Sequence, residues 1–380
     1  MKRIHTAILG TGFMGKVHTE AVRRLGHVDV VALAASPGRD TAPLKESYGI
    51  DNVTNDWEKL LKDPSIHAVH ICTPNSQHAP QALAALQAGK HVLCEKPLAM
   101  SSAEARQMVE LATKNNLVHA TNHNLRYYPM VQHARQMIAA GDLGEILVVQ
   151  GTYSQDWLLY DTDFNWRILA EANGAARVVG DIGSHWMDMI QHLTGQKITS
   201  LCADTMIFHE TRKRPKGSVE TFTGKTLAPS DYEEIAIDTE DFASVLVRLG
   251  DRCRGAYTVS QVSAGNKNSF RFEVYGTKCG LKWDQESPDQ LWIGHRNSPN
   301  QIIVKDPSLM HAAAAGFADL PGGHSEGYDD SHKQLFRRFY RRIADASTPI
   351  DYPTFEDGLR GMHLIEKVLE SSHKRAWVDC

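Results

Sequence analysis

The 380-residue sequence lacks paired cysteines and lacks a strong excess of either charge. Its six cysteines are scattered without a CxxC pair, which argues against a disulfide framework and against a cysteine-based zinc site. We therefore expect reduced thiols and a cytoplasmic location. The formal net charge of -4 at pH 7 gives no excess of positive charge to attract nucleic acid or an anionic membrane. We expect neither as a partner, and the default partner is a small molecule.

Long hydrophobic runs are also missing, since none approaches the roughly 20 residues that a membrane-spanning helix needs. The 19 histidines include no HxH or HExxH pattern and no His/Asp cluster at ligand spacing. The sequence therefore argues against a metal hydrolase, and we expect no metal cofactor. At 380 residues the chain is longer than a single core usually supports, so two domains are expected.

Short apolar runs alternate with longer helical patterns over residues 1–122. Such alternation predicts βαβ units, and therefore an α/β Rossmann domain built on a doubly wound parallel sheet. The expected strands are 4–9, 28–34, 68–72, 91–94 and 117–121, and the expected helices are 15–25, one around Leu44, 79–88 and 102–115.

Residues 123–380 show longer strand patterns, several of them joined by short turns. Short turns favour antiparallel pairing, so we predict an α+β domain with a large, mostly antiparallel open sheet. This domain is expected to bind substrate and to support oligomerisation. The expected strands are 146–153, 198–207, 241–249, 254–260, 270–276 and 281–283, and the expected helices are 129–140, 184–193, 327–344 and 355–372.

A glycine turn follows the first predicted strand and opens the first predicted helix. It reads Gly10-Thr11-Gly12-Phe13-Met14-Gly15 and matches GxGxxG in the strand-turn-helix setting that the motif requires. The first glycine permits a tight turn, the second lets the backbone approach a pyrophosphate, and the third lets helix pack on strand. The helix N-terminus then offers amide donors to the phosphates. We therefore predict a dinucleotide cofactor on these six residues.

The end of the second predicted strand leaves the choice of cofactor open. A carboxylate at this place would bind the ribose hydroxyls of NAD, but the chain carries Ala35 there. Ser36 and Arg39 follow and can hydrogen-bond and neutralise a 2'-phosphate, although Arg39 can also be a solvated loop charge. Both NAD and NADP are therefore compatible with the sequence.

Two further loops follow strands of the predicted parallel sheet. The carboxyl ends of such strands are where ligands bind, so we expect both loops to contact the cofactor. Most lysines on loops are only solvated charges, but Lys96 stands between a strand and a proline, which aims it toward the cofactor. The loop residues concerned are Thr73, Pro74, Asn75 and His78 after one strand and Glu95, Lys96 and Pro97 after the next.

Asp181 and His185 lie four residues apart at the start of a predicted helix, so both can face the same side one turn apart. A histidine near neutral pH can accept and return a proton, which suits a general base. The alternative is structural, with Asp181 as a helix cap and His185 as a buried core residue.

Four motifs together resemble the glucose-fructose oxidoreductase/inositol dehydrogenase/rhizopine catabolism (Gfo/Idh/MocA) family: GTGFMG, TPNSQH, CEKPLAM and DIGSHWMD. The resemblance covers essentially the whole chain. It implies a nicotinamide-dependent oxidoreductase in which Lys96, Asp181 and His185 serve the reaction. The chain departs from many NAD-using members at Ala35, and residues 174–177 read Gly-Ala-Ala-Arg where a glycine-rich stretch is common.

The stretches QDWLLYDTDFNWR, VSQVSAGNKN, LWIGHRNSPN and PGGHSEGYDD resemble a subgroup that includes levoglucosan- and inositol-type dehydrogenases. The resemblance implies hydride transfer from a secondary hydroxyl of a cyclic polyol, sugar or anhydrosugar, or the reverse reduction. His185 would take the hydroxyl proton, Lys96 would stabilise the developing charge, and Asp181 would anchor a neighbouring hydroxyl; Lys96 and His185 can exchange roles.

We expect the substrate site to be lined by aromatic side chains, which stack on sugar rings, and by Asp, Asn and Arg side chains, which form hydrogen bonds with hydroxyl groups. For the tryptophans the alternative is plain core packing. The nominated residues are Arg126, Tyr128, Asp156, Trp157, Asn165, Trp166, Arg167 and His185.

Two other functions fit the same motifs. A glycosidase of this fold can use bound NAD to oxidise, eliminate and re-reduce without net redox change. A cofactor-sensing regulator can keep the fold without the chemistry, although it would not need Lys96, Asp181 and His185 together. A homodimer or homotetramer is expected through the outer face of the second-domain sheet, because that face must be covered.

Overall fold

The computed structural model describes residues 3–217 and 228–380 and divides into two compact units. The first unit comprises Met1–Asn124 and Tyr328–Met362, and the second comprises Leu125–Gly327 and His363–Cys380. The domains expected from sequence are 1–122 and 123–380, whereas the first unit runs to Asn124 and also includes a later segment. The segment Tyr328–Met362 lies in the first unit, although most of the second-unit sheet precedes it in the chain.

The first unit contains a six-stranded parallel sheet with the order β3-β2-β1-β4-β5-β6. This order is that of a doubly wound dinucleotide-binding sheet, so the predicted Rossmann architecture is confirmed. The strands are β1 (Ile4–Leu9), β2 (Val28–Ala34), β3 (Val53–Thr54), β4 (Ala68–Ile71), β5 (His91–Cys94) and β6 (His119–Thr121). The connecting helices are α1 (Phe13–Arg23), α2 (Ala42–Tyr48), α3 (Trp57–Leu61), α4 (His78–Gln87) and α5 (Ser102–Lys114). The short elements β3 and α3 were not predicted.

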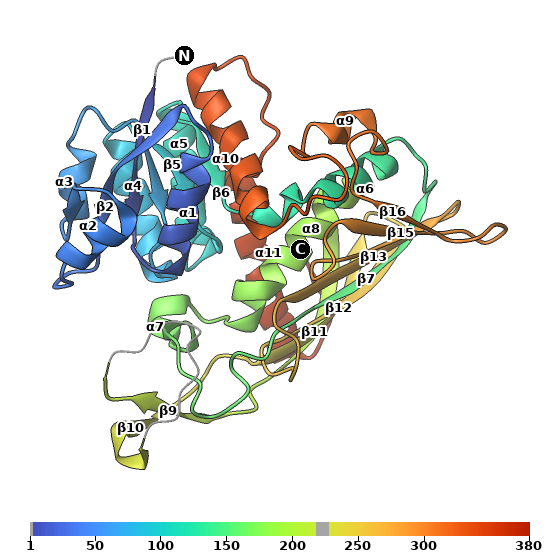
Figure 1. Cartoon of the computed structure of the whole chain (residues 1–380). Helices are drawn as coiled ribbons and strands as arrows, with labels where there is room; N and C mark the ends of the chain where they lie inside the picture. Colours follow the sequence, from blue (N-terminus) through green and yellow to red (C-terminus); the bar gives the residue numbers. More distant parts are fainter. Residues whose placement is uncertain (1–2, 218–227) are drawn as a thin grey trace. The chain divides into compact units, whose positions relative to one another are not determined.

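The returning segment completes the first unit. Helix α10 (Tyr328–Ala344) lies beside α1 (Figure 1) and buries its apolar side, including Phe336 and Phe339. Tyr340 Oη lies 2.7 Å from Nε2 of His70 on the fully buried strand β4. The backbone N–H of Phe355 donates to Nδ1 of His119 at 3.0 Å. These contacts explain why the segment belongs to this unit and not to the one that precedes it in sequence.

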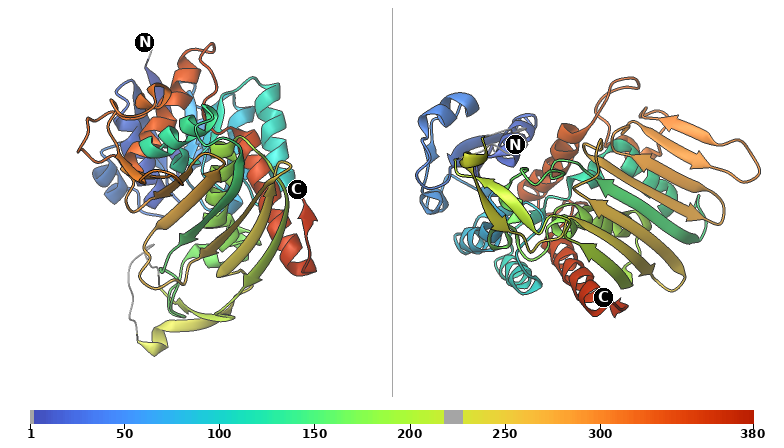
Figure 2. Two further views of the ribbon diagram at one scale, coloured as in Figure 1. Left: turned by 90° about the vertical axis from the view of Figure 1, so that its right-hand side faces the viewer. Right: turned by 90° about the horizontal axis from the view of Figure 1, so that it is seen from below.

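The second unit contains a nine-stranded sheet with the order β16-β15-β14-β13-β7-β12-β11-β8-β17 (Figure 2). Among the described strands of this sheet only β7 and β12 pair in parallel, so the predicted large and mostly antiparallel sheet is confirmed. The strands are β7 (Ile146–Ser154), β8 (Ile198–Met206), β11 (Phe242–Leu249), β12 (Cys253–Ser260), β13 (Ser269–Gly276), β14 (Gly280–Asp284), β15 (Gln290–Gly294), β16 (Gln301–Val304) and β17 (Val378–Asp379). A separate two-stranded sheet pairs β9 (Thr211–Pro215) with β10 (Tyr232–Ala236).

Helices α6 (Pro129–Ala139) and α8 (Ser184–Thr194) pack on one face of this sheet, and within the described part of the chain we call the opposite face the open face. The open face carries exposed apolar side chains at Val148, Leu246 and Ile302. The remaining helices are α7 (Ala170–Asn173), α9 (Ala312–Ala315) and α11 (Phe355–Lys374). None of the helices in the described part of the chain is both long enough and apolar enough to span a bilayer.

The start of α8 differs from the expected helix start. A π-helical turn, Val179–Gly183, precedes the helix and contains Asp181. A π-turn inserts an extra residue into the helical repeat and is frequent at functional sites. Asp181 is therefore part of an irregular turn that leads into α8, and the side chain of Asp181 is not an N-terminal cap of that helix.

Candidate active site

The glycine turn has the geometry that a phosphate-binding turn requires. Gly10 has a φ of +103°, and a Cβ there would lie 2.6 Å from the carbonyl oxygen of Cys72. A Cβ on Gly15 would lie 2.1 Å from the carbonyl oxygen of Gly10, so only glycine lets α1 approach the turn. A Cβ on Gly12, by contrast, would meet none of the described atoms within 4 Å. The three positions thus match the three glycine roles of a dinucleotide turn.

The turn is anchored by the loop that follows β2 and by the end of helix α2. The Tyr48 hydroxyl donates to the carbonyl oxygen of Thr11 at 3.2 Å, and the Arg39 guanidinium donates to Oγ1 of Thr11 at 3.4 Å. Asn55 Nδ2 donates to the carbonyl oxygens of Ser36 and Arg39 at 2.6 and 3.0 Å. Arg39 is thereby held beside the glycine turn with its side chain exposed. It can meet an anionic group on a ribose bound there.

The two further loops of the first unit also lie at strand ends. Thr73 Oγ1 donates to Oε1 of Gln81 at 2.8 Å, and Asn75 begins a short 3₁₀ turn and is buried. The imidazole of His78 lies between two carbonyl oxygens, 2.8 Å from that of Pro97 and 2.9 Å from that of Thr73. His78 therefore links the loop after β4 to the loop after β5.

Glu95 is buried at the end of β5 and is bound by two side chains. His18 Nε2 lies 2.8 Å from Oε1 of Glu95, and Nδ2 of Asn122 donates to the same oxygen. Burial opposes ionisation, but the His18 hydrogen bond and the charges of His18 and Lys96 outweigh it and lower the pKa of Glu95 to about 2. The next residue, Lys96, is half-buried. A carboxylate with a lowered pKa thus directly precedes the candidate catalytic lysine.

In the second unit, two polar side chains hold the carboxylate of Asp181. Gln261 Nε2 donates to Oδ2 at 2.8 Å, and Arg167 Nε lies 3.4 Å from Oδ1. Asp181 is only 9% exposed, so these partners replace most of its water. Hydrogen bonds to a carboxylate favour its ionised form and fix its direction. Asp181 is therefore suited to accept a hydrogen bond from a ligand hydroxyl.

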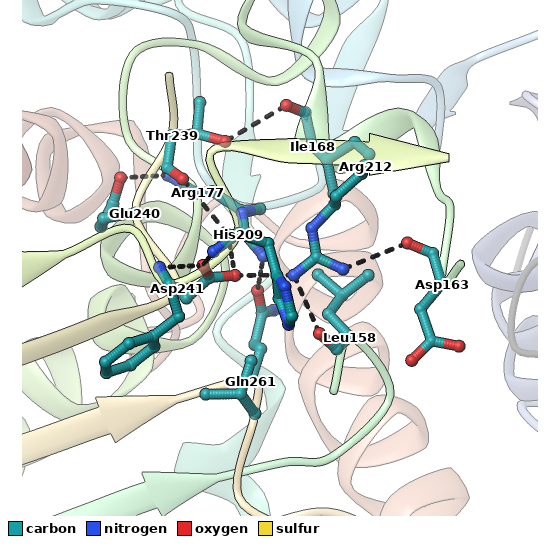
Figure 3. Close-up of polar contacts among 12 residues, drawn as sticks. Leu158, Asp163, Ile168, Arg177, His209, Arg212, Thr239, Glu240, Asp241 and Gln261 are labelled. Atoms are coloured by element: carbon teal, nitrogen blue, oxygen red, sulfur yellow. Dashed lines mark hydrogen bonds and ion pairs between the residues drawn. The ribbon is translucent and has the colours of Figure 1, made fainter. Parts of the chain in front are cut away.

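Gln261 contacts a buried ionic cluster of Arg177, Arg212 and Asp241 (Figure 3). Arg177 and Arg212 both donate to Oδ1 of Asp241, and all three side chains are fully buried. Burial opposes ionisation of Asp241, but the charges of Arg177 and Arg212 outweigh it and lower the pKa of its carboxyl. Arg177 also donates to Oε1 of Gln261 at 3.5 Å. The cluster is thus connected to Asp181 through one glutamine side chain.

His185 occupies the first turn of α8 and is 7% exposed. Its ring centroid lies 6.0 Å from that of Tyr153 on β7, with the ring planes tilted by 57°. The structure therefore places Asp181 and His185 on consecutive turns of one continuous helical segment, against the inner face of the sheet. Lys96 belongs to the other compact unit.

Several nominated substrate residues gather around Asp181. Asn165 precedes a 3₁₀ turn, and its Oδ1 accepts the backbone N–H of Arg167 at 3.1 Å. The guanidinium of Arg167 lies 4.4 Å above the ring of Trp166. Arg167 thus joins an aromatic face to the Asp181 carboxylate, which is the pairing expected for a ligand with both an apolar ring face and hydroxyls.

The other nominated residues have partners within the protein. Asp156 Oδ2 accepts from Nζ of Lys267 at 2.7 Å, and Trp157 Nε1 donates to Oε1 of Gln155 at 2.7 Å. Arg126 forms a bidentate ion pair with Asp188, with Nε 2.8 Å from Oδ2.

Tyr128 is 2% exposed, and its ring packs against Trp283. Arg126 and Tyr128 thus each have a partner within the second unit, and their contact with substrate stays a prediction.

Sequence reasoning missed Gln261, Asp188 and the pair Arg212 and Asp241. Gln261 lies within the stretch VSQVSAGNKN, which was noted for its resemblance but not for any single side chain. The others carried no signal, because each partner is distant in the chain.

The six-stranded parallel sheet and its glycine turn define a dinucleotide-binding domain. Residues 4–123 match the oxidoreductase family with an NAD-binding Rossmann fold, and residues 131–282 match the GFO/IDH/MocA C-terminal domain. The chain belongs to the Gfo/Idh/MocA family of oxidoreductases.

Individual relatives are enzymes that act on sugars and related compounds. The chain is 28% identical to a levoglucosan dehydrogenase from Pseudarthrobacter phenanthrenivorans, over 100% of this chain and 98% of the relative. It is 42% identical to a 1,5-anhydro-D-fructose reductase from Ensifer adhaerens, over 80% of this chain and 84% of the relative. A solved levoglucosan dehydrogenase in complex with NADH and L-sorbose matches with a TM-score of 0.89 at 27% identity, covering 100% of this chain and 99% of that one.

Proposed function

We propose that the protein is an NAD(P)-dependent dehydrogenase that oxidises a secondary hydroxyl of a cyclic sugar, anhydrosugar or polyol to a ketone, or catalyses the reverse reduction. The observation that carries this proposal is the buried Asp181 carboxylate, which is held by Gln261 and Arg167 four residues before the buried imidazole of His185. A fixed acceptor beside a proton-accepting ring suits a substrate with neighbouring hydroxyls. The relatives named above support the substrate class.

Loss of hydride from a carbinol carbon requires simultaneous loss of the hydroxyl proton, because an alkoxide is otherwise too unstable. We propose that His185 accepts this proton and that Lys96 donates a hydrogen bond to the same oxygen. Asp181 would accept a hydrogen bond from an adjacent hydroxyl and so orient the ring. A nicotinamide, when bound, supplies the hydride acceptor. Lys96 and His185 can exchange these roles.

The cofactor is proposed to bind the glycine turn from Gly10 to Gly15, with Ser36 and Arg39 at the ribose and the loops after β4 and β5 nearby. The exposed Arg39 beside Thr11 supports acceptance of a 2'-phosphate. Ala35 offers no carboxylate to exclude it. We therefore propose that the enzyme accepts NADP as well as NAD.

We also propose a homodimer or homotetramer formed through the open face of the nine-stranded sheet. The exposed Val148, Leu246, Ile302 and Val304 on this face support it, since apolar side chains on a sheet face favour burial against a partner. Light scattering of the purified chain tests this proposal, and a monomer at all concentrations would contradict it.

The function is tested by assaying levoglucosan, 1,5-anhydro sugars, cyclitols and aldoses with NAD and with NADP, following reduced cofactor by absorbance. Lys96→Ala and His185→Asn should each lower kcat by roughly 10²- to 10⁴-fold, the range for loss of a general acid or base. Lys114→Ala, at an exposed lysine of α5, is the matched control. Glycoside cleavage without release of reduced cofactor would indicate the glycosidase instead, and cofactor binding without any turnover would indicate the regulator.

A further inference from the structure

Three buried side chains with metal-ligating atoms meet in the first unit. In the described part of the chain, His18, Glu95 and His332 bring one ligand atom each to within 4.8 Å of one another. They come from α1, from the end of β5 and from α10. The two histidines are fully buried, and Glu95 is 6% exposed. Such a set is uncommon in a protein interior unless its charge and lone pairs are compensated.

Two acceptors at this cluster have no hydrogen-bond donor. His332 Nδ1 lies 2.9 Å from the carbonyl oxygen of Tyr328, and because a carbonyl can only accept, Nδ1 carries the proton of the neutral ring. Its Nε2 therefore has a lone pair, and this atom is buried without a partner. Oδ1 of Asn122, whose amide nitrogen contacts Glu95, is likewise buried without a partner. Two buried acceptor atoms, His332 Nε2 and Asn122 Oδ1, thus lie near the Glu95 carboxylate without a hydrogen-bond donor of their own.

His18 has the second-sphere contact that a metal-binding histidine needs. Its Nδ1 lies 2.9 Å from Nδ1 of His70, whose Nε2 lies 2.7 Å from the Tyr340 hydroxyl. Without a metal ion, a proton on Nε2 of His18 meets the Glu95 carboxylate 2.8 Å away; when a cation takes the place of that proton, the neutral ring holds its proton on Nδ1 and donates it to His70. Its Nε2 is then free to bind a cation beside Glu95. A second hydrogen bond of this kind fixes the tautomer and the orientation of metal-binding imidazoles.

We infer that His18 Nε2, His332 Nε2 and the Glu95 carboxylate form a binding site for a divalent transition-metal ion of the zinc type. Two imidazoles and one carboxylate suit zinc, whereas magnesium and calcium prefer oxygen ligands throughout. A 180° flip of the Asn122 side-chain amide exchanges its nitrogen and oxygen and makes Oδ1 the fourth ligand. Metal-ligand distances of about 2.0–2.2 Å bring tetrahedral ligands to roughly 3.4 Å of one another. The ligand atoms, now up to 4.8 Å apart, therefore have to approach one another by up to about 1.4 Å on binding.

The bound ion would join α1, β5 and α10, and thus segments from both ends of the first unit's sequence. Its role is structural, because all four ligands come from the protein and leave no open position for a substrate. The inference departs from the expectation of no metal cofactor, which rested on the spacing of ligands along the sequence.

The full chain, freed of metal with a chelator, is titrated with Zn²⁺ by calorimetry and with Co²⁺ by visible absorption. His332→Asn is the test variant, because its amide nitrogen can keep the hydrogen bond to the Tyr328 carbonyl while the ligating nitrogen is lost. His373→Asn, at an exposed histidine of α11, is the matched control.

We expect the wild type and the control to bind one more zinc ion than His332→Asn, with at least a roughly 100-fold loss of affinity at this site in the variant. We also expect tetrahedral Co²⁺ absorption and a zinc-dependent rise in Tm that only the variant lacks. Equal zinc stoichiometry in all three proteins would overturn the inference. If His332→Asn does not fold, X-ray absorption of the zinc-loaded wild type decides: two imidazoles with oxygen ligands support the site, and any other ligation or no retained zinc overturns it.

Discussion

Gln261 donates a hydrogen bond of 2.8 Å from Nε2 to Oδ2 of Asp181, while its own oxygen accepts from Arg177 at 3.5 Å. A guanidinium can only donate, so Arg177 fixes which end of the Gln261 amide faces Asp181. The buried cluster of Arg177, Arg212 and Asp241 therefore sets the direction of a hydrogen bond on the candidate substrate anchor.

Replacing Gln261 with methionine keeps the size of the side chain and removes this hydrogen bond. A hydrogen bond to a charged group contributes about 1.5–3 kcal/mol, which corresponds to roughly 10- to 100-fold. We expect Gln261→Met to lower kcat/KM by about this factor, measured with the best substrate of the panel, while circular dichroism stays unchanged. Gln301→Met, at an exposed glutamine of β16, should have no effect. Equal kcat/KM for both variants would show that Asp181 does not need Gln261.

Arg39→Ala should separate the two cofactors. The guanidinium lies beside the glycine turn, where it can pair with a 2'-phosphate that NAD lacks. We expect kcat/KM with NADP to fall by roughly 10-fold or more, while the value with NAD changes by less than about 2-fold. Lys45→Ala on the neighbouring helix α2 is the control, since its side chain is exposed. Equal losses with both cofactors would mean that Arg39 supports only the loop.

Asp241→Asn should strongly destabilise the protein. The change leaves two fully buried guanidinium groups without their shared carboxylate, and breaking a buried ionic pair costs on the order of 3–5 kcal/mol. Urea denaturation measures the loss. The control is Asp284→Asn, whose ion pair with Arg271 is partly exposed and should contribute no more than about 1 kcal/mol. A loss of the same size in both variants would refute the importance of the buried cluster.

Stability should fall as the pH drops from about 6.5 to 4, in part through His91. Burial, together with the charge of His67, lowers the pKa of His91 to about 4. In this window the unfolded chain binds a proton that the folded chain does not, so protonation favours unfolding. His91→Asn keeps an acceptor for the N–H of Val118 and removes the titration. Between pH 6.5 and 4 the variant should lose less unfolding free energy than the wild type, by roughly 2–3 kcal/mol. Parallel pH profiles would contradict this.

The fold was predictable from sequence because most of its elements are marked locally. Strands β1, β2 and β5 begin and end where their apolar runs do, and the glycine turn stands between a strand and a helix. Among the elements that were missed, β3 with two residues and α3 with five are too short to show a period. The π-turn at Asp181 escaped prediction because a single extra residue in a helical repeat leaves no pattern.

The candidate site was less predictable, since its supporting contacts join distant residues. Lys96, Asp181 and His185 lie in short motifs, but Gln261 follows Asp181 by 80 residues and Asp241 follows Arg177 by 64. No spacing rule connects such pairs. The same holds for His332, which no sequence pattern relates to His18 or Glu95.

Helix α10 also has a consequence for synthesis of the chain. The six-stranded sheet is complete at Thr121, but the helix that covers α1 and contacts His70 begins only at Tyr328. At about 5–20 residues per second, a ribosome needs on the order of 10–40 s to make the intervening segment. During that time the apolar surface later covered by Phe336 and Phe339 is exposed in the nascent chain. A chaperone that binds this surface would therefore act until translation is nearly finished.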